Sequence, residues 1–149
     1  MPDNALIRAA RTGELADIER ALLRCKNIHA IGAYGRNAIH WVVDRGEIDS
    51  LERLLAEGID CNVSDVNGMT ALQGSSLKGD AEMIGVLLNA GANIEAQNAI
   101  GRTSLHWAVC EGHAEAVNAL IKAGANGEAR DRRGLTVIQS RATQSKRPL

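Results

Sequence analysis

Glycine recurs at a fixed interval along this 149-residue chain, and that interval limits the possible fold more than any other feature. Three separate series keep a spacing of 33 residues: Gly35, Gly68, Gly101 and Gly134; Gly13, Gly46, Gly79 and Gly112; and Gly58, Gly91 and Gly124. Three series with one period indicate a stacked repeat architecture, in which each unit is one supersecondary element. Each unit depends on its neighbours, because it cannot bury its apolar face alone.

The residue pattern of each unit predicts two short helices that are joined by a tight turn and followed by a long loop. In the unit that starts at Gly101, Thr103 can cap a helix through its hydroxyl. Gly112 ends this first helix, and Gly124 fits the position after the second helix, where a left-handed backbone favours glycine. Between these residues the apolar side chains recur at helical spacing: Leu105, Ala108, Val109, Ala116, Val117, Leu120 and Ile121.

The units resemble the ankyrin repeat, whose pattern runs roughly D-x-x-G-x-T-P-L-H-x-A, then G-H, then L-L-x-x-G-A. Copies of this pattern begin at Asp65, Asn98 and Asp131. The resemblance implies an all-α solenoid of stacked helix pairs, with β-hairpin loops that project from one edge. It covers the chain as a single domain, with repeats at about 1–34, 35–67, 68–100 and 101–133 and a C-terminal capping half-repeat at 134–149.

The chain departs from the family pattern in three ways. The proline of the motif is absent throughout, which predicts less rigid helix starts. The first unit begins directly at a helix, and the last helix, near Val137–Gln144, is polar, as expected of units that cap a stack. The third unit carries Gly74-Ser75-Ser76, which costs its first helix about 2 kcal/mol in propensity. This helix is therefore expected either to fray or to leave a narrow notch between Trp41 and Trp107.

Composition and charge argue against several kinds of partner. The net charge is −1, but residues 54–129 carry −6 and residues 130–149 carry +5. Three aromatic residues are too few for a base-stacking surface, so nucleic acid is not the expected partner. Three widely spaced cysteines favour a reducing compartment. Because no signal region or membrane-length apolar stretch is present, we expect a cytoplasmic or nuclear protein without a membrane partner.

No residue pattern supports catalysis. His106 and Cys110 lie four residues apart on one helix face, as a nucleophilic pair can. However, His106 occupies the structural histidine position of the repeat motif, and Gln73 and Gln139 replace it in two other units. A bracing role permits this exchange and a catalytic role does not. The histidines and cysteines lack metal-ligand spacing, and no phosphate-binding glycine motif occurs, so we expect no enzyme activity, metal or cofactor.

The resemblance implies that a protein partner binds the tips of the hairpins and the concave face of the first helices. Carried over position by position, the expected contact residues are Tyr34, Arg36, Trp41, Asp44, Arg45, Asn67, Met69, Leu77, Lys78, Ile100, Arg102, Trp107, Cys110, Glu111, Arg132, Arg133 and Leu135. The two tryptophans can instead pack between repeats. Asn62 lies in a pattern similar to that modified by asparaginyl hydroxylases, although an asparagine that serves in a hairpin turn is the favoured explanation.

These observations favour a monomeric protein-binding module that acts as an adaptor, inhibitor or scaffold. Two alternatives remain at this point. The chain can be a structural assembly subunit or a fragment of a larger ankyrin scaffold. It can also associate with nucleic acid through its basic C-terminal end, whose residues are Arg130, Arg132, Arg133, Arg141, Lys146 and Arg147.

Overall fold

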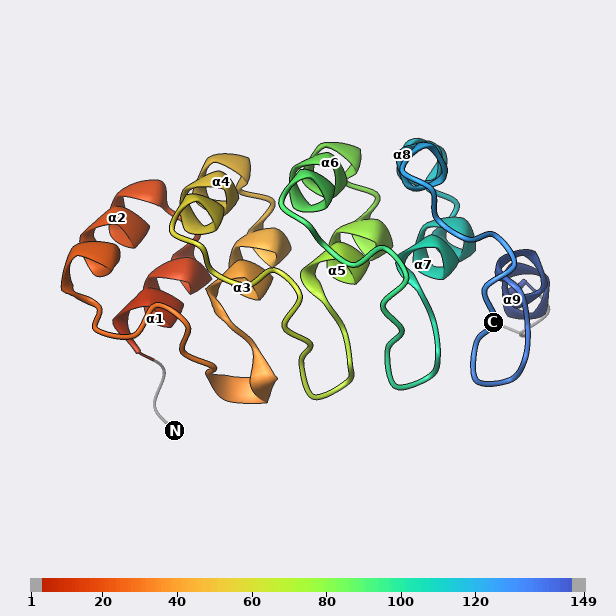
Figure 1. Cartoon of the computed structure of the whole chain (residues 1–149), viewed down its shortest axis with the longest axis horizontal. Coiled ribbons are helices and arrows are strands. Elements are labelled where there is room, and N and C mark those ends of the chain that lie inside the picture. The colour runs from red at the N-terminus through yellow and green to blue at the C-terminus, as the bar shows by residue number, and fades with distance from the viewer. Residues whose placement is uncertain (1–3, 146–149) are drawn as a thin grey trace.

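The computed structural model describes residues 4–145, and within them every regular element is helical. The α-helices are α1 (Ala5–Thr12), α2 (Leu15–Arg24), α3 (Ala38–Arg45), α4 (Ile48–Ala56), α5 (Ala71–Lys78), α6 (Ala81–Asn89), α7 (Ser104–Glu111), α8 (Ala114–Lys122) and α9 (Val137–Gln144). A short 3₁₀ turn covers Ala33–Gly35. Within these residues the α-helices form four pairs and a final single helix. They lie in one row (Figure 1), which confirms the all-α solenoid.

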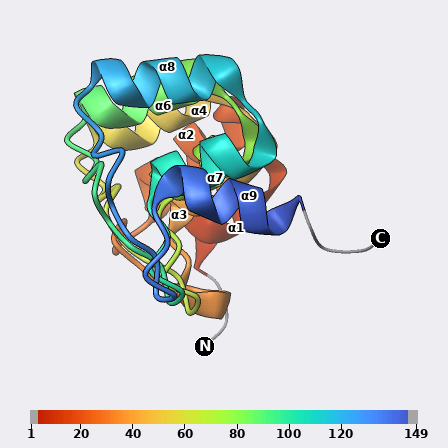
Figure 2. The same ribbon diagram turned by 90° about the vertical axis from the view of Figure 1, so that its right-hand side faces the viewer.

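The helices form two layers. The inner layer consists of α1, α3, α5, α7 and α9, each packed against the next, and the outer layer consists of α2, α4, α6 and α8. Four loops project from the inner layer on one side, as the end-on view in Figure 2 shows. We name these the hairpin loops and assign them residues 31–37, 64–70, 97–103 and 130–136.

The hairpin loops are less regular than the β-hairpins expected from the family pattern. Each closes on itself through backbone hydrogen bonds, such as the one from the Asn98 amide to the Arg102 carbonyl (3.0 Å). In residues 4–145 the one isolated β-bridge pairs Arg130 with Thr136, and no strand extends from it. The loops therefore take a hairpin path without forming a ladder.

One backbone hydrogen bond joins each hairpin loop to the next. The amides of Val66, Ala99 and Arg132 donate to the carbonyls of Tyr34, Asn67 and Ile100, at 2.9, 3.0 and 2.9 Å. These close approaches require a glycine directly after each residue whose carbonyl accepts the hydrogen bond. A Cβ atom on Gly101 would lie 2.5 Å from the Arg132 nitrogen, and one on Gly68 would lie 2.8 Å from the Ala99 nitrogen. This contact explains the glycines at Gly35, Gly68 and Gly101, whereas Gly134 meets no such neighbour and has only the positive φ angle in common with them.

Side-chain caps replace the missing proline at the helix starts. Asn37, Thr70 and Thr103 precede α3, α5 and α7, and each accepts a hydrogen bond from the amide three residues later. Such a bond satisfies one of the unpaired amides of the first turn. The helices end at Gly46, Gly79 and Gly112, whose φ angles are positive.

The third repeat keeps its first helix intact. Helix α5 is continuous from Ala71 to Lys78, so the expected fraying is not seen. Ser75 and Ser76 are fully buried, and both hydroxyls donate to the Leu72 carbonyl, at 2.9 and 2.7 Å. Burial without a partner would be costly, but these local bonds satisfy both hydroxyl donors.

The last helix only partly fits the expected polar cap. Gln139 and Arg141 are exposed, as a polar cap requires, but Ser140 is fully buried. The Ser140 hydroxyl donates to the buried Asp131 carboxylate (3.0 Å), which lies in the preceding hairpin loop. Ile138 is 77% exposed, although Ile39, Leu72 and Leu105 at the same repeat position are buried.

Candidate protein-binding surface

The residues predicted to contact a partner all lie on the hairpin loops and inner helices, and none is fully buried. We call this part of the molecule the hairpin side. The exposed residues are Tyr34, Asp44, Arg45, Asn67, Leu77, Lys78, Ile100, Glu111, Arg132 and Arg133. The half-buried residues are Arg36, Trp41, Met69, Arg102, Trp107, Cys110 and Leu135. The repeat register thus brings the predicted residues to one side of the stack.

Arginine stacks on tryptophan in the second and fourth repeats. The guanidinium carbon of Arg36 lies 4.3 Å from the centre of the Trp41 ring, and that of Arg102 lies 4.9 Å from the centre of Trp107. Such cation–π contacts fix both side chains, because the charge faces the electron-rich ring. The third repeat carries Met69 at the corresponding arginine position and glycine at the tryptophan position.

A small pocket lies between α3 and α5, beside the glycine of the third repeat. Gly74, Val43, Leu77 and Met69 line it together with charged groups of α3 and α5, and its volume is about 150 Å³. Neither Trp41 nor Trp107 lines this pocket, so it is not the notch expected between the two tryptophans.

The two tryptophans have different surroundings. Trp41 packs against the hydrophobic core and also lies beside Arg11, whose guanidinium carbon is 4.7 Å from the ring centre. Trp107 instead lines an open cleft of about 350 Å³ with Met69, Asn98 and Ile100. The structure therefore places Trp41 mainly in packing and Trp107 at the edge of a surface cleft.

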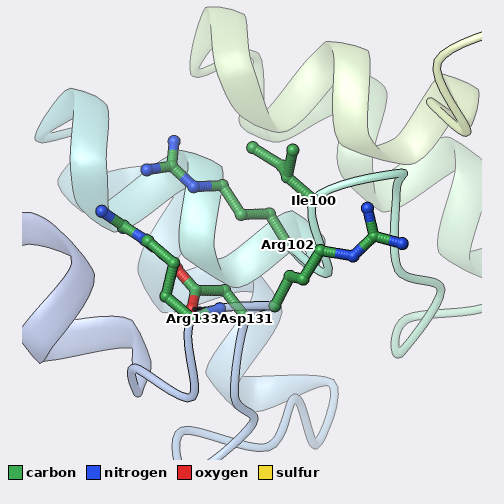
Figure 3. A pocket seen from close by; sticks show the side chains of 5 residues that line it. Ile100, Arg102, Asp131 and Arg133 are labelled. Carbon is green, nitrogen blue, oxygen red and sulfur yellow. Dashed lines mark hydrogen bonds and ion pairs between the residues drawn. The ribbon is translucent and has the colours of Figure 1, made fainter.

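A second pocket lies beside this cleft and is basic. Ile100 and Arg102 from one hairpin loop and Asp131 and Arg133 from the next converge on it, as Figure 3 shows. Arg132 also lines the pocket, whose volume is about 310 Å³. Ile100 lines both spaces, so an apolar cleft and a basic pocket lie next to each other.

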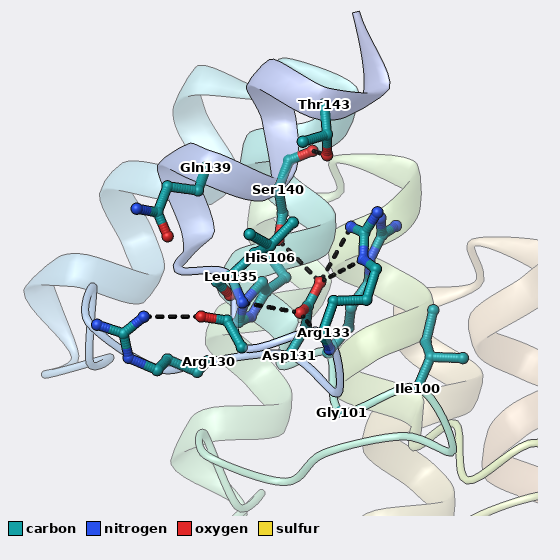
Figure 4. Close-up of polar contacts among 12 residues, drawn as sticks. Ile100, Gly101, His106, Arg130, Asp131, Arg133, Leu135, Gln139, Ser140 and Thr143 are labelled. Carbon is teal, nitrogen blue, oxygen red and sulfur yellow. Dashed lines mark hydrogen bonds and ion pairs between the residues drawn. The ribbon is translucent and has the colours of Figure 1, made fainter. Parts of the chain in front are cut away.

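Asp131 organises the loop that carries two of these arginines. Its carboxylate accepts hydrogen bonds from the Leu135 amide (3.1 Å), the Ser140 hydroxyl (3.0 Å) and Arg133 Nη2 (3.1 Å) (Figure 4). Burial by itself raises the pKa of Asp131, but these hydrogen bonds outweigh it and hold the pKa below its ordinary value. The ionised carboxylate therefore braces the last hairpin loop against α9.

Charge is divided between the two sides of the stack. Among residues 4–145 the hairpin side carries ten basic groups against four acidic ones, a net charge of +6. The outer helices and the loops that follow them carry five basic groups against thirteen acidic ones, a net charge of −8. The basic groups of the hairpin side are Arg8, Arg11, Arg36, Arg45, Lys78, Arg102, Arg130, Arg132, Arg133 and Arg141. Counting charge along the chain missed this division, because each repeat contributes to both sides.

The comparison with known families agrees with this architecture. The family model described as ankyrin repeats, in three copies, matches residues 39–131. The chain belongs to the ankyrin-repeat family. A search of curated proteins finds no match to the chain. Ankyrin repeats are generally protein–protein interaction modules, and the family is typically non-enzymatic.

The histidines of this ankyrin protein brace its loops. In His40, Nε2 donates to the Met69 carbonyl (3.1 Å), and Nδ1 lies 3.2 Å from the Asn37 amide nitrogen and 2.9 Å from the Asn37 side-chain oxygen. His106 repeats the arrangement with Thr103 and Leu135. Burial lowers the pKa of both histidines, which favours the neutral form of the ring.

Gln73 serves the same purpose at the histidine position of the third repeat. Its side-chain nitrogen donates to the carbonyls of Ala96 (2.7 Å) and Arg102 (3.1 Å) and so fixes the next hairpin loop. The Cys110 thiol has its pKa raised by burial, so it is poorly suited to act as a nucleophile beside His106.

Asn62 connects two successive long loops. Its side-chain oxygen accepts from the Asn93 amide (2.7 Å), and its side-chain nitrogen donates to the Gly91 carbonyl (3.1 Å). These bonds account for an asparagine at this position, and its hydroxylation stays a prediction.

Two further features bear on the partner. No helix within residues 4–145 is both long and apolar enough to cross a membrane, and no cluster of metal-ligating side chains occurs there. Lys146 and Arg147, which were expected to extend the basic end, lie outside the described residues. Arg130, at the same end, donates to the Gly134 carbonyl (2.7 Å) within its own loop.

Proposed function

We propose that this ankyrin protein is a non-catalytic interaction module, an adaptor, inhibitor or scaffold, that binds another protein on its hairpin side. The observation that carries the proposal is the concentration of exposed apolar and basic groups on that side. Tyr34, Val66 and Ile100 are exposed at the loop tips, beside the arginine–tryptophan stacks. Tyrosine, tryptophan and arginine supply most of the binding energy in typical interfaces.

The hairpin side is also ordered before binding. Backbone hydrogen bonds join successive loop tips, and the buried Asp131 fixes the last loop. A surface that is already ordered loses less conformational entropy when a partner binds. These contacts favour recognition of a partner over a purely internal role for the loops.

The three cysteines argue for a reducing compartment. Cys25, Cys61 and Cys110 are all unpaired, and Cys61 is buried. A protein with free thiols of this kind fits the cytoplasm or nucleus. The net charge of +6 on the hairpin side also disfavours a dimer that pairs the hairpin sides of two copies, because these sides would repel each other.

Two alternatives to protein binding lead to different results. A structural assembly subunit would self-associate or join a larger scaffold, and sedimentation at increasing concentration would reveal the self-association. A nucleic-acid-associated protein would bind DNA or RNA with an affinity that falls steeply with salt. The apolar cleft at Trp107 supports a protein partner, since a phosphate backbone has nothing to place in it.

The proposal is tested by affinity capture from native lysate with three baits. The first bait is the wild type, and the second combines Tyr34→Ala with Arg102→Glu on the hairpin side. The third is a matched control on the exposed face of α2, Leu23→Ala with Arg24→Glu. Thermal melting verifies that all three are folded.

The proposal predicts a protein that the wild type and the outer-side control capture and that the hairpin variant loses. Loss from the outer-side control alone would place the binding surface on the outer helices. Equal capture by all three baits would also contradict the proposed surface.

A further inference from the structure

The arginine–tryptophan stacks of the second and fourth repeats differ in one respect. In the second repeat, Arg36 forms an ion pair with Asp44 of α3, with 2.6 Å between Nη2 and Oδ2. In the fourth repeat, Cys110 of α7 occupies the position that corresponds to Asp44. Arg102 therefore has the same ring contact as Arg36 but lacks the carboxylate.

Arg102 has no replacement for that carboxylate within the described residues. No ion pair or side-chain hydrogen bond of its guanidinium group occurs in residues 4–145; its charged group contacts the Trp107 ring. A guanidinium that stacks on a ring still presents its edge, with several N–H donors arranged to fit a carboxylate.

The space where the carboxylate is missing is strongly basic. Arg102, Arg133 and Arg141 all act electrostatically on the Cys110 thiol, and Glu111 is the acidic side chain that acts on it. Arg133 faces Asp131, whereas Arg102 and Arg141 have no ion pair within the described residues. An anion above Cys110 would thus be attracted by two guanidinium groups without an ion pair in the described residues, one from a hairpin loop and one from α9.

The adjoining cleft adds an apolar requirement. Trp107, Met69 and Ile100 line this space, and Ile100 also borders the basic pocket. A ligand that fills both spaces needs an apolar group and an anionic group a few ångströms apart. Neighbouring residues of a peptide satisfy this requirement.

We propose that the partner of this protein supplies an aspartate or glutamate side chain that binds Arg102 above Cys110, in the position that Asp44 takes at Arg36. An apolar residue beside that acidic residue enters the cleft at Trp107. The proposal rests on the proposed function and specifies the partner as an acidic peptide segment.

The test uses peptides selected by the protein itself from a phage-displayed library of random sequences. The affinities of the enriched peptides are then measured by fluorescence anisotropy with the wild type and two variants. Cys110→Asp fills the anion position with an internal carboxylate, whereas Cys110→Asn places a side chain of the same shape there without the charge.

We expect the enriched peptides to contain aspartate or glutamate next to an aliphatic or aromatic residue. Cys110→Asp weakens their binding by about tenfold or more, because the new carboxylate occupies Arg102 and repels the ligand. Cys110→Asn, which adds similar bulk without the charge, weakens their binding less than Cys110→Asp does. Arg102→Gln provides an independent measurement and weakens the same peptides by about tenfold.

Enrichment of neutral or basic peptides, or equal affinities for Cys110→Asp and Cys110→Asn, would overturn the acidic-partner proposal. If such peptides still fail to bind the Tyr34→Ala variant, the proposed function stands and the proposed ligand chemistry alone is wrong. Failure to enrich any peptide, combined with binding of a labelled single-stranded RNA or DNA, would overturn both proposals.

Discussion

The contact between successive hairpin loops yields a prediction with an internal control. Gly101 and Gly134 occupy the same repeat position, with φ angles of +76° and +77°. A Cβ atom on Gly101 would lie 2.5 Å from the Arg132 nitrogen, whereas one on Gly134 would meet nothing within 4 Å. The variants Gly101→Ala and Gly134→Ala therefore share the backbone strain and differ in the contact.

The two costs can be estimated separately. An alanine in the left-handed region costs about 1–2 kcal/mol relative to an unstrained residue, and both variants incur this strain. Gly101→Ala also forces the Arg132 backbone away and removes the hydrogen bond to the Ile100 carbonyl, which contributes about 1 kcal/mol. We expect destabilisation of about 1–2 kcal/mol for Gly134→Ala and about 2–3 kcal/mol for Gly101→Ala.

Urea denaturation followed by circular dichroism measures the loss of unfolding free energy in each variant. Hydrogen exchange at the Arg132 amide adds a local measurement, and exchange should be faster in Gly101→Ala and unchanged in Gly134→Ala. Equal destabilisation of the two variants, with the Arg132 amide equally protected, would refute the account of how the loop tips are joined.

Three further predictions concern stability. Burial lowers the pKa of His40 and His106 in the folded state, so the wild type should lose stability as the pH falls below about 6.5, the pKa of an unfolded histidine. A double variant, His40→Gln with His106→Gln, should flatten this dependence in urea melts at about pH 7.5 and about pH 5.5, and an unchanged slope would contradict the neutral bracing role. Gly74→Ala should stabilise the protein by about 1 kcal/mol in urea, because its Cβ would lie an ordinary 3.8 Å from Val43 inside a helix; a loss of stability would show that the pocket cannot accept a methyl group. Asp131→Ala should destabilise the protein by about 2–3 kcal/mol, because it leaves the Ser140 hydroxyl and two loop amides without their acceptor; a change below about 0.5 kcal/mol in thermal or urea melts would argue against the brace.

The sequence predicted the helices well because their signals are local. Thr103 and Gly112 mark the two ends of α7 within a few residues, and the 33-residue period repeats such signals along the chain. The position of the predicted contact residues on one side followed from the same register.

Other features depend on residues that are distant in the sequence. Ser140 belongs to the polar last helix, but the side chain is buried because the carboxylate of Asp131 gives it a partner. The basic hairpin side and the acidic outer side become visible only when residues of all repeats are sorted by layer. Likewise, the missing partner of Arg102 is recognised by comparison with the Arg36–Asp44 ion pair, which the sequence alone did not indicate.

Site-specific photo-crosslinking tests the hairpin side as the binding surface most directly. Ile100 on a hairpin loop and Ile121 on outer helix α8 are the same residue type and are exposed to 48% and 51%. Each is replaced, in turn, by a photoreactive benzoylphenylalanine, and adducts formed in native lysate are identified by mass spectrometry. Binding on the hairpin side predicts a discrete protein adduct at position 100 and none at position 121. An adduct at position 121 alone, or equal adducts at both positions, would contradict it.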